Sequence, residues 1–387
     1  MRAYVAGVGM TPFTRIGGDT TYPRMVAEAV RHALADAGLG YGDVQRAAVG
    51  YVFQPSTAGQ RALYDVGLTG IPVVNVNNNC ATGSTALMLA REWVQSGVAD
   101  VALAVGFEQM TREAMAGRPT GVSTIDAHLA ALPGAGTPVT AWFFARAAEE
   151  HMRRHGTTVE DLARVAVKNH EHSTRNPLAQ FRRAFTLDEV LADKTVSGPL
   201  TRTQCSPLSD GAAAAVVVSE RTARAVEIVS QRMVTDTAES FAGGSAIAVV
   251  GAPMTRRATA EVLADAGVGI DDIDVIELHD CFSINELLTY EAMGLCPEGG
   301  GGELVRSGAT TYGGTWVVNP SGGLISKGHP LGATGLAQCA ELVWQLRGEA
   351  GDRQVPGARL ALAHNLGLGG ACVVTLFRGG SHGNAGT

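Results

Sequence analysis

The sequence has few aromatic residues and no long uninterrupted apolar run. Phe, Trp and Tyr make up 5% of the 387 residues, whereas 49 residues are glycine. No stretch has the length and purity of a membrane-spanning helix, and the N-terminal MRAYVAGVGMTPF has no signal-peptide pattern. We therefore expect a soluble cytoplasmic protein that has no membrane partner.

An excess of positive charge is also missing. The formal net charge is −7, so no overall basic field attracts nucleic acid or an anionic membrane surface. We therefore predict that nucleic acid is not a partner. Any anionic ligand must be held by local groups.

Paired cysteines are missing as well. The six cysteines stand at positions 80, 205, 281, 296, 339 and 372, and no C-x-x-C pair occurs. The chain is long and not cysteine-dense, which argues against a disulfide framework. The spacing also argues against a structural zinc site, and we predict no metal. Most of these thiols should be small buried hydrophobic groups, which leaves one or two for chemistry.

The sequence does contain an internal repeat. Residues 34–44 (LADAGLGYGDV) and 263–273 (LADAGVGIDDI) agree at seven of eleven positions. A helical pattern precedes both copies, and each helix is predicted to end at a glycine, Gly38 or Gly267. Strand-like runs follow at 47–52 and 275–278.

A second repeat lies downstream of the first. Residues 81–93 and 333–344 both begin with Ala-Thr-Gly, have a helical pattern and carry a tryptophan at the end. Apolar strands at 101–105 and 360–363 follow. The same order of elements twice predicts two α/β halves related by a pseudo-twofold axis. We place the halves at 1–225 and 226–380, with a tail at 381–387.

The stretch from about 110 to 200 has a different character. It is rich in Arg, His and Glu, with helical patterns near 139–155 and 159–170. We interpret it as a helical loop region inserted into the first half, covering one face as a solvated cap. Some of its arginines could contact an anionic cofactor: Arg146, Arg153, Arg154, Arg182 and Arg183.

Cys80 is the strongest candidate for a nucleophile. A β-branched strand pattern at 73–76 leads through three asparagines to Cys80, and small residues then open a helix. This places the sulfur at a helix N-terminus, where free N–H groups and the helix dipole stabilise a thiolate and can bind an oxyanion. The alternative is a small residue in a tight turn.

His329 is the candidate base. It stands in a glycine-rich loop, residues 319–335, directly before the second-half helix. By the pseudo-twofold relation, this loop is the counterpart of the Cys80 turn, so the two should meet between the halves. A phosphate-binding loop is the rival interpretation, but the P-loop and G-x-G-x-x-G patterns are both absent.

Two further segments end near second-half strands. In the first, His279 and Cys281 alternate to one face and could supply an oxyanion donor and a second thiol, or could simply be buried. A metal site of the His-x-Cys kind lacks further ligands at useful spacing. In the second, residues 363–370, the turn containing His364 and Gly367 is either part of an oxyanion hole or a tight bend.

These residues together resemble the thiolase superfamily, and in particular thiolases of the sterol carrier protein X type. The resemblance covers the chain to about Phe377 and is most specific at 77–87, 279–282, 285–290 and 319–338. It implies the thiolase fold, in which two αβα halves form five αβαβα layers. It also implies a homodimer or homotetramer, and coenzyme A as co-substrate with no bound cofactor.

The resemblance also implies residue roles. Cys80 would attack the keto carbon of a β-ketoacyl-CoA, and His329 would activate it. His279 stands where ordinary thiolases have the asparagine of an oxyanion site. The C-terminal Cys-x-Gly motif of ordinary thiolases is absent, and Cys281 is expected to take over its acid/base role. The implied substrate is a branched-chain or sterol-side-chain β-ketoacyl-CoA, cleaved to a shorter acyl-CoA plus acetyl-CoA or propionyl-CoA.

Three alternative functions remain at this point. Related retro-aldolases act on sterol side-chain CoA esters with a small partner protein, and Cys80 argues against that activity. Condensing ketosynthases use a Cys-His-His set, and Cys281 beside His279 argues for a thiolase instead. A non-catalytic lipid-binding protein on the same fold is the third alternative.

Overall fold

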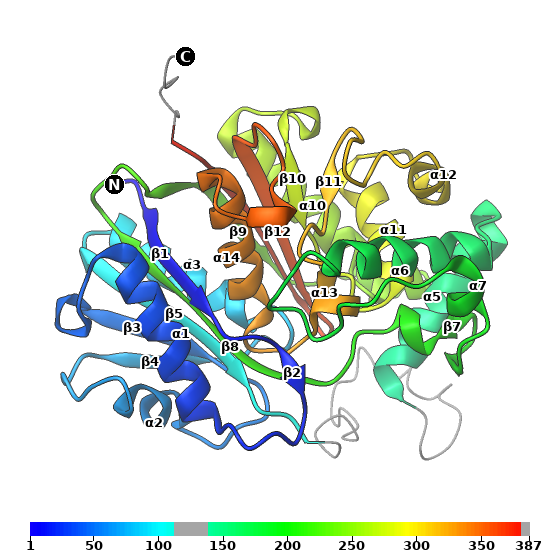
Figure 1. Ribbon diagram of the computed structural model, residues 1–387. Coiled ribbons are helices and arrows are strands. Elements are labelled where there is room, and N and C mark those ends of the chain that lie inside the picture. The colour runs from blue at the N-terminus through cyan, green and yellow to red at the C-terminus, as the bar shows by residue number, and fades with distance from the viewer. Residues whose placement is uncertain (112–137, 381–387) are drawn as a thin grey trace.

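The computed structural model describes residues 1–111 and 138–380, which fold into two similar α/β halves (Figure 1). The elements of the first half are β1 (Tyr4–Met10), α1 (Tyr22–Ala37), β3 (Arg46–Gly50), α2 (Ala58–Tyr64), β4 (Val73–Val76), α3 (Thr82–Gln95), β5 (Val101–Glu108) and β8 (Ser209–Val218). Those of the second half are β9 (Val226–Val234), α10 (Ala252–Ala266), β10 (Val275–Glu277), α11 (Ser283–Met293), β11 (Val317–Val318), α14 (Thr334–Arg347), β12 (Leu360–Gly367) and β13 (Ala371–Arg378).

The two halves have the same strand order and the same strand directions. The first runs β1-β8-β5-β3-β4 and the second β9-β13-β12-β10-β11. In each half the first two pairings are antiparallel and the last two are parallel. β1 pairs with β9 through Tyr4 with Glu227 and Val5 with Val226, which joins both halves into one sheet. The predicted pseudo-twofold repeat is confirmed.

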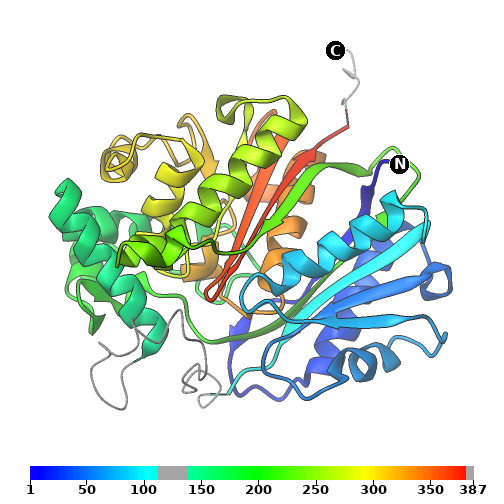
Figure 2. The same cartoon turned by 180° about the vertical axis from the view of Figure 1, so that it is seen from behind.

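Helices cover both faces of each half and also fill the space between them. The central core contains α3 and α14 together with one face of each half's strands. On the outer faces, α1 and α2 pack on the first half, whereas α10 and α11 pack on the second (Figures 1 and 2). The layers therefore follow the predicted αβαβα order.

The repeated helices end where the sequence predicts. α1 is followed by Gly38 with φ 68°, and α10 by Gly267 with φ 67°. Both values lie in the left-handed region, which glycine enters without the strain that a Cβ atom would cause.

Glycine residues let α3 and α14 approach each other closely. A Cβ atom on Gly83 would lie 2.8 Å from the carbonyl oxygen of Gly332, and one on Gly335 would lie 2.2 Å from Ser84 Oγ. Both distances are too short for real contacts. The helix starts of the two halves therefore approach each other at the pseudo-axis because these positions have no side chain.

The inserted region joins β5 to β8 but packs on the second half. Its described helices are α5 (Val139–His155), α6 (Val159–Ser173) and α7 (Leu187–Leu191), with a small hairpin of β6 (Thr195–Ser197) and β7 (Leu200–Thr201). α6 contacts α11 and also α12 (Gly301–Arg306) and α13 (Gly323–Lys327), and its Asn169 and His172 are fully buried. The expectation of a solvated cap is therefore wrong for α6. Residues 112–137 of this region lie outside the described residues.

The described chain also contains the short elements β2 (Thr14–Arg15), α8 (Glu239–Ala242) and α9 (Ala246–Val249), and four 3-10 turns at 41–43, 202–204, 270–272 and 351–353. None of the helices in the described ranges is long and apolar enough to cross a membrane.

Candidate active site

Cys80 lies in a short loop between β4 and α3, at the junction of the two halves. The loop is held by its own polar groups: Thr82 Oγ1 accepts from the N–H of Asn78 at 2.8 Å and donates to the carbonyl of Asn79 at 2.6 Å. Asn79 has φ 50°, a left-handed conformation that asparagine tolerates better than most residues. The sequence order of strand, asparagines, Cys80 and helix thus forms a tight, internally bonded turn.

The protonation of Cys80 differs from the expectation. Burial raises the pKa of the Cys80 thiol to about 12, and the carboxylate of Glu108 adds to the rise, although the N–H groups of Cys80 and Leu368 act in the opposite direction. The prediction of a thiolate stabilised by the helix N-terminus is therefore wrong. Burial outweighs the N–H groups, so a base must remove the proton when Cys80 reacts.

His329 is suited to be that base. Its Nδ1 lies 2.7 Å from Thr334 Oγ1, and the Thr334 hydroxyl donates its single hydrogen to the carbonyl of Pro330 at 3.0 Å. The Thr334 oxygen must then accept from His329 Nδ1–H, which leaves the lone pair of the ring on Nε2. Burial, aided by the nearby Lys327 ammonium, lowers the pKa of His329 to about 3. His329 is therefore a neutral imidazole at pH 7.

His279 follows β10 and faces His329. The two ring centroids are 5.0 Å apart and the rings are nearly perpendicular. Burial holds the pKa of His279 well below its usual range, and the neighbouring His329 and His364 act in the same direction. His279 Nδ1 lies 3.2 Å from Asn365 Nδ2.

Cys281 is positioned by the residue that precedes it. Asp280 accepts from the N–H of Leu324 at 2.7 Å, at the start of α13, and from Asn169 Nδ2 at 2.7 Å. This ties the strand end carrying Cys281 to the short helix that leads into His329. The Cys281 thiol is buried, and burial raises its pKa well above the usual range.

The predicted residues come together in one cavity. The reactive atoms of Cys80, His279 and His329 all lie within 4.8 Å of one another. They line a cavity of about 530 Å³, together with Cys281. Among the described residues, the same Cys-His-His set is the group that could hold a metal ion, with one coordination position left open.

Most of the remaining cavity wall is apolar. It comes from the first half, the inserted helices and the second half, and includes Val52, Phe53, Met110, Val139, Phe143, Phe144, Leu208, Phe241, Val249, Phe282, Leu331, Leu366 and Leu368. A ligand with an apolar body can therefore place one reactive end against Cys80 and bury the rest.

The turn predicted around His364 and Gly367 lies further along the chain. β12 continues through Gly367, and the turn to β13 follows it. His364 does not line the cavity, because its Nδ1 accepts from the N–H of His279 at 3.3 Å and its Nε2 contacts Thr255 Oγ1 at 2.9 Å. Its ring thus supports His279 and is not free to bind an oxyanion.

Gly367 permits a close contact with the nucleophile loop. A Cβ atom there would lie 2.3 Å from the carbonyl oxygen of Asn78 and 3.2 Å from the N–H nitrogen of Ala81. Its place in the site is therefore next to the Cys80 backbone. The following residues, Leu368 and Gly369, are the ones that line the cavity.

Three of the five candidate arginines of the inserted region gather at a second cavity. Arg146, Arg153 and Arg154 line a polar hollow of about 500 Å³ beside α5, with Glu149, Glu150 and Ser245. Arg154 is paired with Glu150 at 3.1 Å. Arg182 and Arg183 are exposed elsewhere, before α7.

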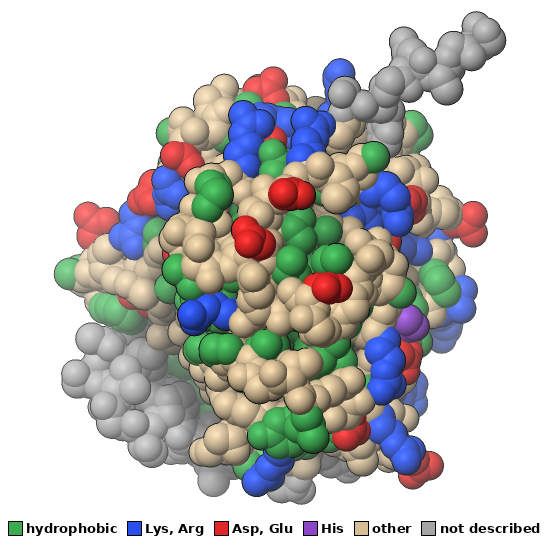
Figure 3. All heavy atoms as spheres, turned by 90° about the vertical axis from the view of Figure 1, so that its left-hand side faces the viewer, with side chains coloured by type: hydrophobic (Ala, Val, Ile, Leu, Met, Phe, Trp, Pro, Cys, Tyr) green, Lys and Arg blue, Asp and Glu red, His purple; other side chains and the backbone are tan. Residues whose placement is uncertain are grey.

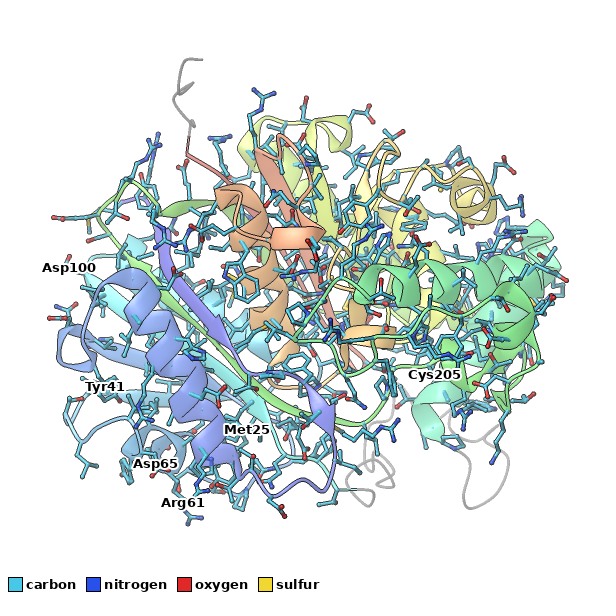
Figure 4. The ribbon with its side chains drawn as sticks, in the orientation of Figure 1. Met25, Tyr41, Arg61, Asp65, Asp100 and Cys205 are labelled. Carbon is cyan, nitrogen blue, oxygen red and sulfur yellow. The ribbon has the colours of Figure 1, made fainter. Side chains whose placement is uncertain are left out.

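The other cysteines are also thiols. All six are free. Cys205, which Figure 4 shows beside the inserted helices, contacts the carbonyl of Thr201 at 3.2 Å. Cys296, Cys339 and Cys372 do not line the main cavity.

Sequence reasoning missed four polar residues around the site. Thr334, Asn365 and Asp280 each lie within a motif that drew attention for a neighbouring residue. Glu108 ends the apolar strand β5 and accepts from the N–H groups of Val52, Phe53 and Gly332. In the sequence, the feature that could have drawn attention to Glu108 is its place as an acidic residue at the end of an apolar strand.

Comparisons with known proteins agree with this architecture. The family described as "Thiolase, N-terminal domain" matches residues 3–221, and "Thiolase C-terminal domain-like" matches 245–377. Human sterol carrier protein 2 is 54% identical, with 98% of this chain and 72% of that protein covered. An acetyl-CoA acetyltransferase of Methanothermobacter thermautotrophicus is 38% identical, with 96% and 98% covered.

Among solved structures, the Ltp2-ChsH2(DUF35) aldolase has a similar fold. It superposes with a TM-score of 0.84 at 23% identity and covers 98% of both chains. At that identity the likeness concerns the fold alone. The family matches and the two relatives carry the assignment: the chain belongs to the thiolase family and is an acyltransferase.

Proposed function

We propose that this protein cleaves a β-ketoacyl-CoA with a bulky apolar acyl group, by thiolysis through an acyl-Cys80 intermediate. The observation that carries the proposal is the convergence of Cys80, His329, His279 and Cys281 on one apolar cavity. The products would be a shortened acyl-CoA and acetyl-CoA or propionyl-CoA. The name of the related acetyl-CoA acetyltransferase supports CoA as the carrier of the acyl groups.

In the first half-reaction His329 Nε2 takes the proton of the Cys80 thiol, and the sulfur attacks the keto carbon of the substrate. The bond between the keto carbon and the α-carbon then breaks, and its electron pair forms the enolate of the departing acyl-CoA. A ring N–H of His279 donates to the enolate oxygen, an interaction typically worth ~3 kcal/mol. The Cys281 thiol gives its proton to the α-carbon, which releases acetyl-CoA or propionyl-CoA.

In the second half-reaction free CoA takes over the acyl group. The Cys281 thiolate accepts the proton of the CoA thiol, and the CoA sulfur attacks the thioester carbonyl of acyl-Cys80. Collapse of the tetrahedral intermediate expels the Cys80 sulfur, which recovers its proton from His329. Both thiols and both histidines then have their starting protonation, so the cycle is balanced.

The cavity wall supports a branched-chain or sterol-side-chain substrate. Five phenylalanines lie around it, of which Phe144 and Phe282 stack with ring centroids 4.8 Å apart. A two-carbon acyl group would leave most of a cavity of about 530 Å³ empty. A branched or ring-bearing acyl group would bury its apolar surface there, at roughly 25 cal/mol per Å² removed from water.

A substrate panel tests the proposal. Straight-chain, methyl-branched and sterol-derived β-ketoacyl-CoA esters are each incubated with CoA, and both acyl-CoA products and the remaining CoA are quantified by mass spectrometry. We expect CoA consumption, a preference for the bulky substrates, and loss of activity in Cys80→Ser. Cys296→Ser, away from the cavity, is the matched control and should stay active. Cleavage without CoA consumption, or an active Cys80→Ser variant, would overturn the proposal.

A homodimer is part of the proposal, supported by the free edge of the sheet. Among the described strands, β4 ends the sheet of the first half, and its Val74 is 41% exposed. Hydrophobic side chains gather in the middle of the adjoining face, with most Lys and Arg around its rim (Figure 3). Light scattering should give twice the mass of the chain, and Val74→Lys should lower it.

A further inference from the structure

Asn365 is a buried side chain that does not reach the cavity but contacts a residue that does. It lies on β12, and its Nδ2 is 3.2 Å from His279 Nδ1. The structure turns the Asn365 NH2 group to His279 and leaves Asn365 Oδ1 buried without a hydrogen-bond partner. An amide nitrogen has no lone pair to offer, so in this orientation Asn365 is the donor and His279 Nδ1 is the acceptor. A neutral imidazole has one ring hydrogen, which must then be on Nε2.

The rest of His279 is held just as firmly. Its backbone N–H donates to His364 Nδ1 at 3.3 Å, and His364 Nε2–H in turn meets Thr255 Oγ1 at 2.9 Å. Its carbonyl accepts from Asn285 Nδ2. With Nδ1 bonded to Asn365, Nε2–H is the ring nitrogen of His279 that is left for the cavity it lines.

This arrangement matters because a neutral imidazole can carry its one ring hydrogen on either nitrogen. In one tautomer a ring nitrogen donates to an oxyanion, and in the other the same nitrogen presents a lone pair that repels it. We propose that Asn365 is a positioning residue that keeps neutral His279 in the Nε2–H tautomer, so that its cavity edge is always a donor. The role of that donor in stabilising the enolate rests on the proposed function, whereas the tautomer itself does not.

The titratable groups that face His279 carry no charge that could select its tautomer. From the neighbouring elements these are His329, His364, Cys80 and Cys281, all of them uncharged at pH 7 by the pKa directions given above. Asp280 is turned toward α13 and bonded there. No described carboxylate contacts the His279 ring, so the amide of Asn365 alone sets which ring nitrogen is protonated.

Replacing that amide by a carboxylate makes a sharp test. In Asn365→Asp the ionised carboxylate can only accept, so His279 Nδ1 must then carry a hydrogen. At low pH the ring is then an imidazolium that still donates from Nε2. At high pH it is the Nδ1–H tautomer, whose Nε2 lone pair faces the oxyanion.

We expect the kcat of Asn365→Asp to be within about tenfold of the wild-type value at pH 6. By pH 8.5 its kcat should fall about 100-fold with little change in KM, because one oxyanion donor is typically worth 10²–10³ in rate. Wild type should lack this alkaline loss. Asn75→Asp is the control: the half-buried Asn75 on β4 accepts from the N–H of Gly59 through Oδ1, so the substitution adds the same charge elsewhere and should keep the wild-type pH profile. Parallel pH profiles for Asn365→Asp and wild type would overturn the proposal.

Nitrogen-15 NMR of histidine-labelled protein reads the tautomer without substrate. Wild-type His279 should show a protonated Nε2 and a bare Nδ1 at neutral pH, and Asn365→Ser, whose hydroxyl can donate or accept, should show both tautomers. A wild-type signal with hydrogen on Nδ1 would refute the assignment even if Asn365→Asp fails to fold. If the tautomer is as expected but no CoA is consumed, the proposed function fails and this inference stands.

Discussion

Replacing Thr334 by valine should slow the enzyme while leaving its shape intact. Valine has nearly the same volume but cannot accept from His329 Nδ1–H or donate to the carbonyl of Pro330, contacts of 2.7 and 3.0 Å in the folded protein. The buried His329 Nδ1–H would lose its partner, whereas the Pro330 carbonyl still accepts from the backbone N–H groups of Ala333 and Thr334. An unsatisfied buried group costs about 1–3 kcal/mol, so the free energy of unfolding should fall by about 1–3 kcal/mol.

The effect on rate follows from the charge that His329 acquires. When it takes the proton of Cys80 it becomes an imidazolium, and a hydrogen bond to a charged group contributes about 1.5–3 kcal/mol. At 1.4 kcal/mol per factor of ten, the loss of that contact predicts a fall in kcat/KM of about 10- to 100-fold. The Thr334 hydroxyl also determines which nitrogen of His329 is basic, so the alkylation of Cys80 by iodoacetamide should slow in parallel.

Thr334→Ser is the control, because it keeps the hydroxyl. Thiolysis rates and alkylation rates are measured for wild type and both variants at pH 7.5, with urea unfolding to confirm that each is folded. The serine variant should stay within a few-fold of wild type. A valine variant as fast as wild type, or a serine variant as slow as the valine one, would refute the assigned hydrogen-bond order.

Two further substitutions and a change of pH have predicted outcomes. Gly367→Ala puts a Cβ atom 2.3 Å from the Asn78 carbonyl, so the Cys80 loop must move and kcat should fall at least tenfold, measured by thiolysis. Glu277→Gln leaves the buried Lys327 ammonium, 3.2 Å away, without its counter-charge, and urea unfolding should show a loss of about 3–5 kcal/mol. Acid should destabilise the fold, since buried His329 and the other buried histidines have pKa values near 3–4, whereas in the unfolded chain they take protons below about pH 6.5. Glu108 and Asp280, both with a pKa raised to about 7, oppose this most strongly because they take their protons in the folded state. The four histidines outnumber these two carboxyl groups, so the midpoint of urea unfolding should drop from pH 6.5 to 4.5, and a rising midpoint would contradict the assignment.

The fold was largely predictable because its evidence is repeated in the sequence. Two copies of one helix–strand pattern predict two similar halves, and the glycines at 38 and 267 mark the same helix end in each. Symmetry then places the Cys80 turn opposite the His329 loop, and both line one cavity. These inferences work because helix ends and strand patterns are local properties of the chain.

The error at residues 364–367 shows the limit of such patterns. Glycines after an apolar run predict a turn, but β12 continues through Gly367 because β13 pairs with it across the whole segment. Strand length here depends on a partner strand, not on local propensity. The inserted helices were misjudged for a similar reason: α6 is polar in sequence, yet its polar groups are buried against the second half.

The sequence by itself determined the two-half architecture, the residues available for chemistry and, through its motifs, the family. Only the tertiary structure decided how those residues are protonated. Burial keeps Cys80 a thiol and both histidines neutral. Thr334, in the same loop as His329, and Asn365, on a different strand from His279, assign a hydrogen to one nitrogen of each ring. A pKa depends on the solvent and charges that surround a group in three dimensions, which the order of residues along the chain does not reveal.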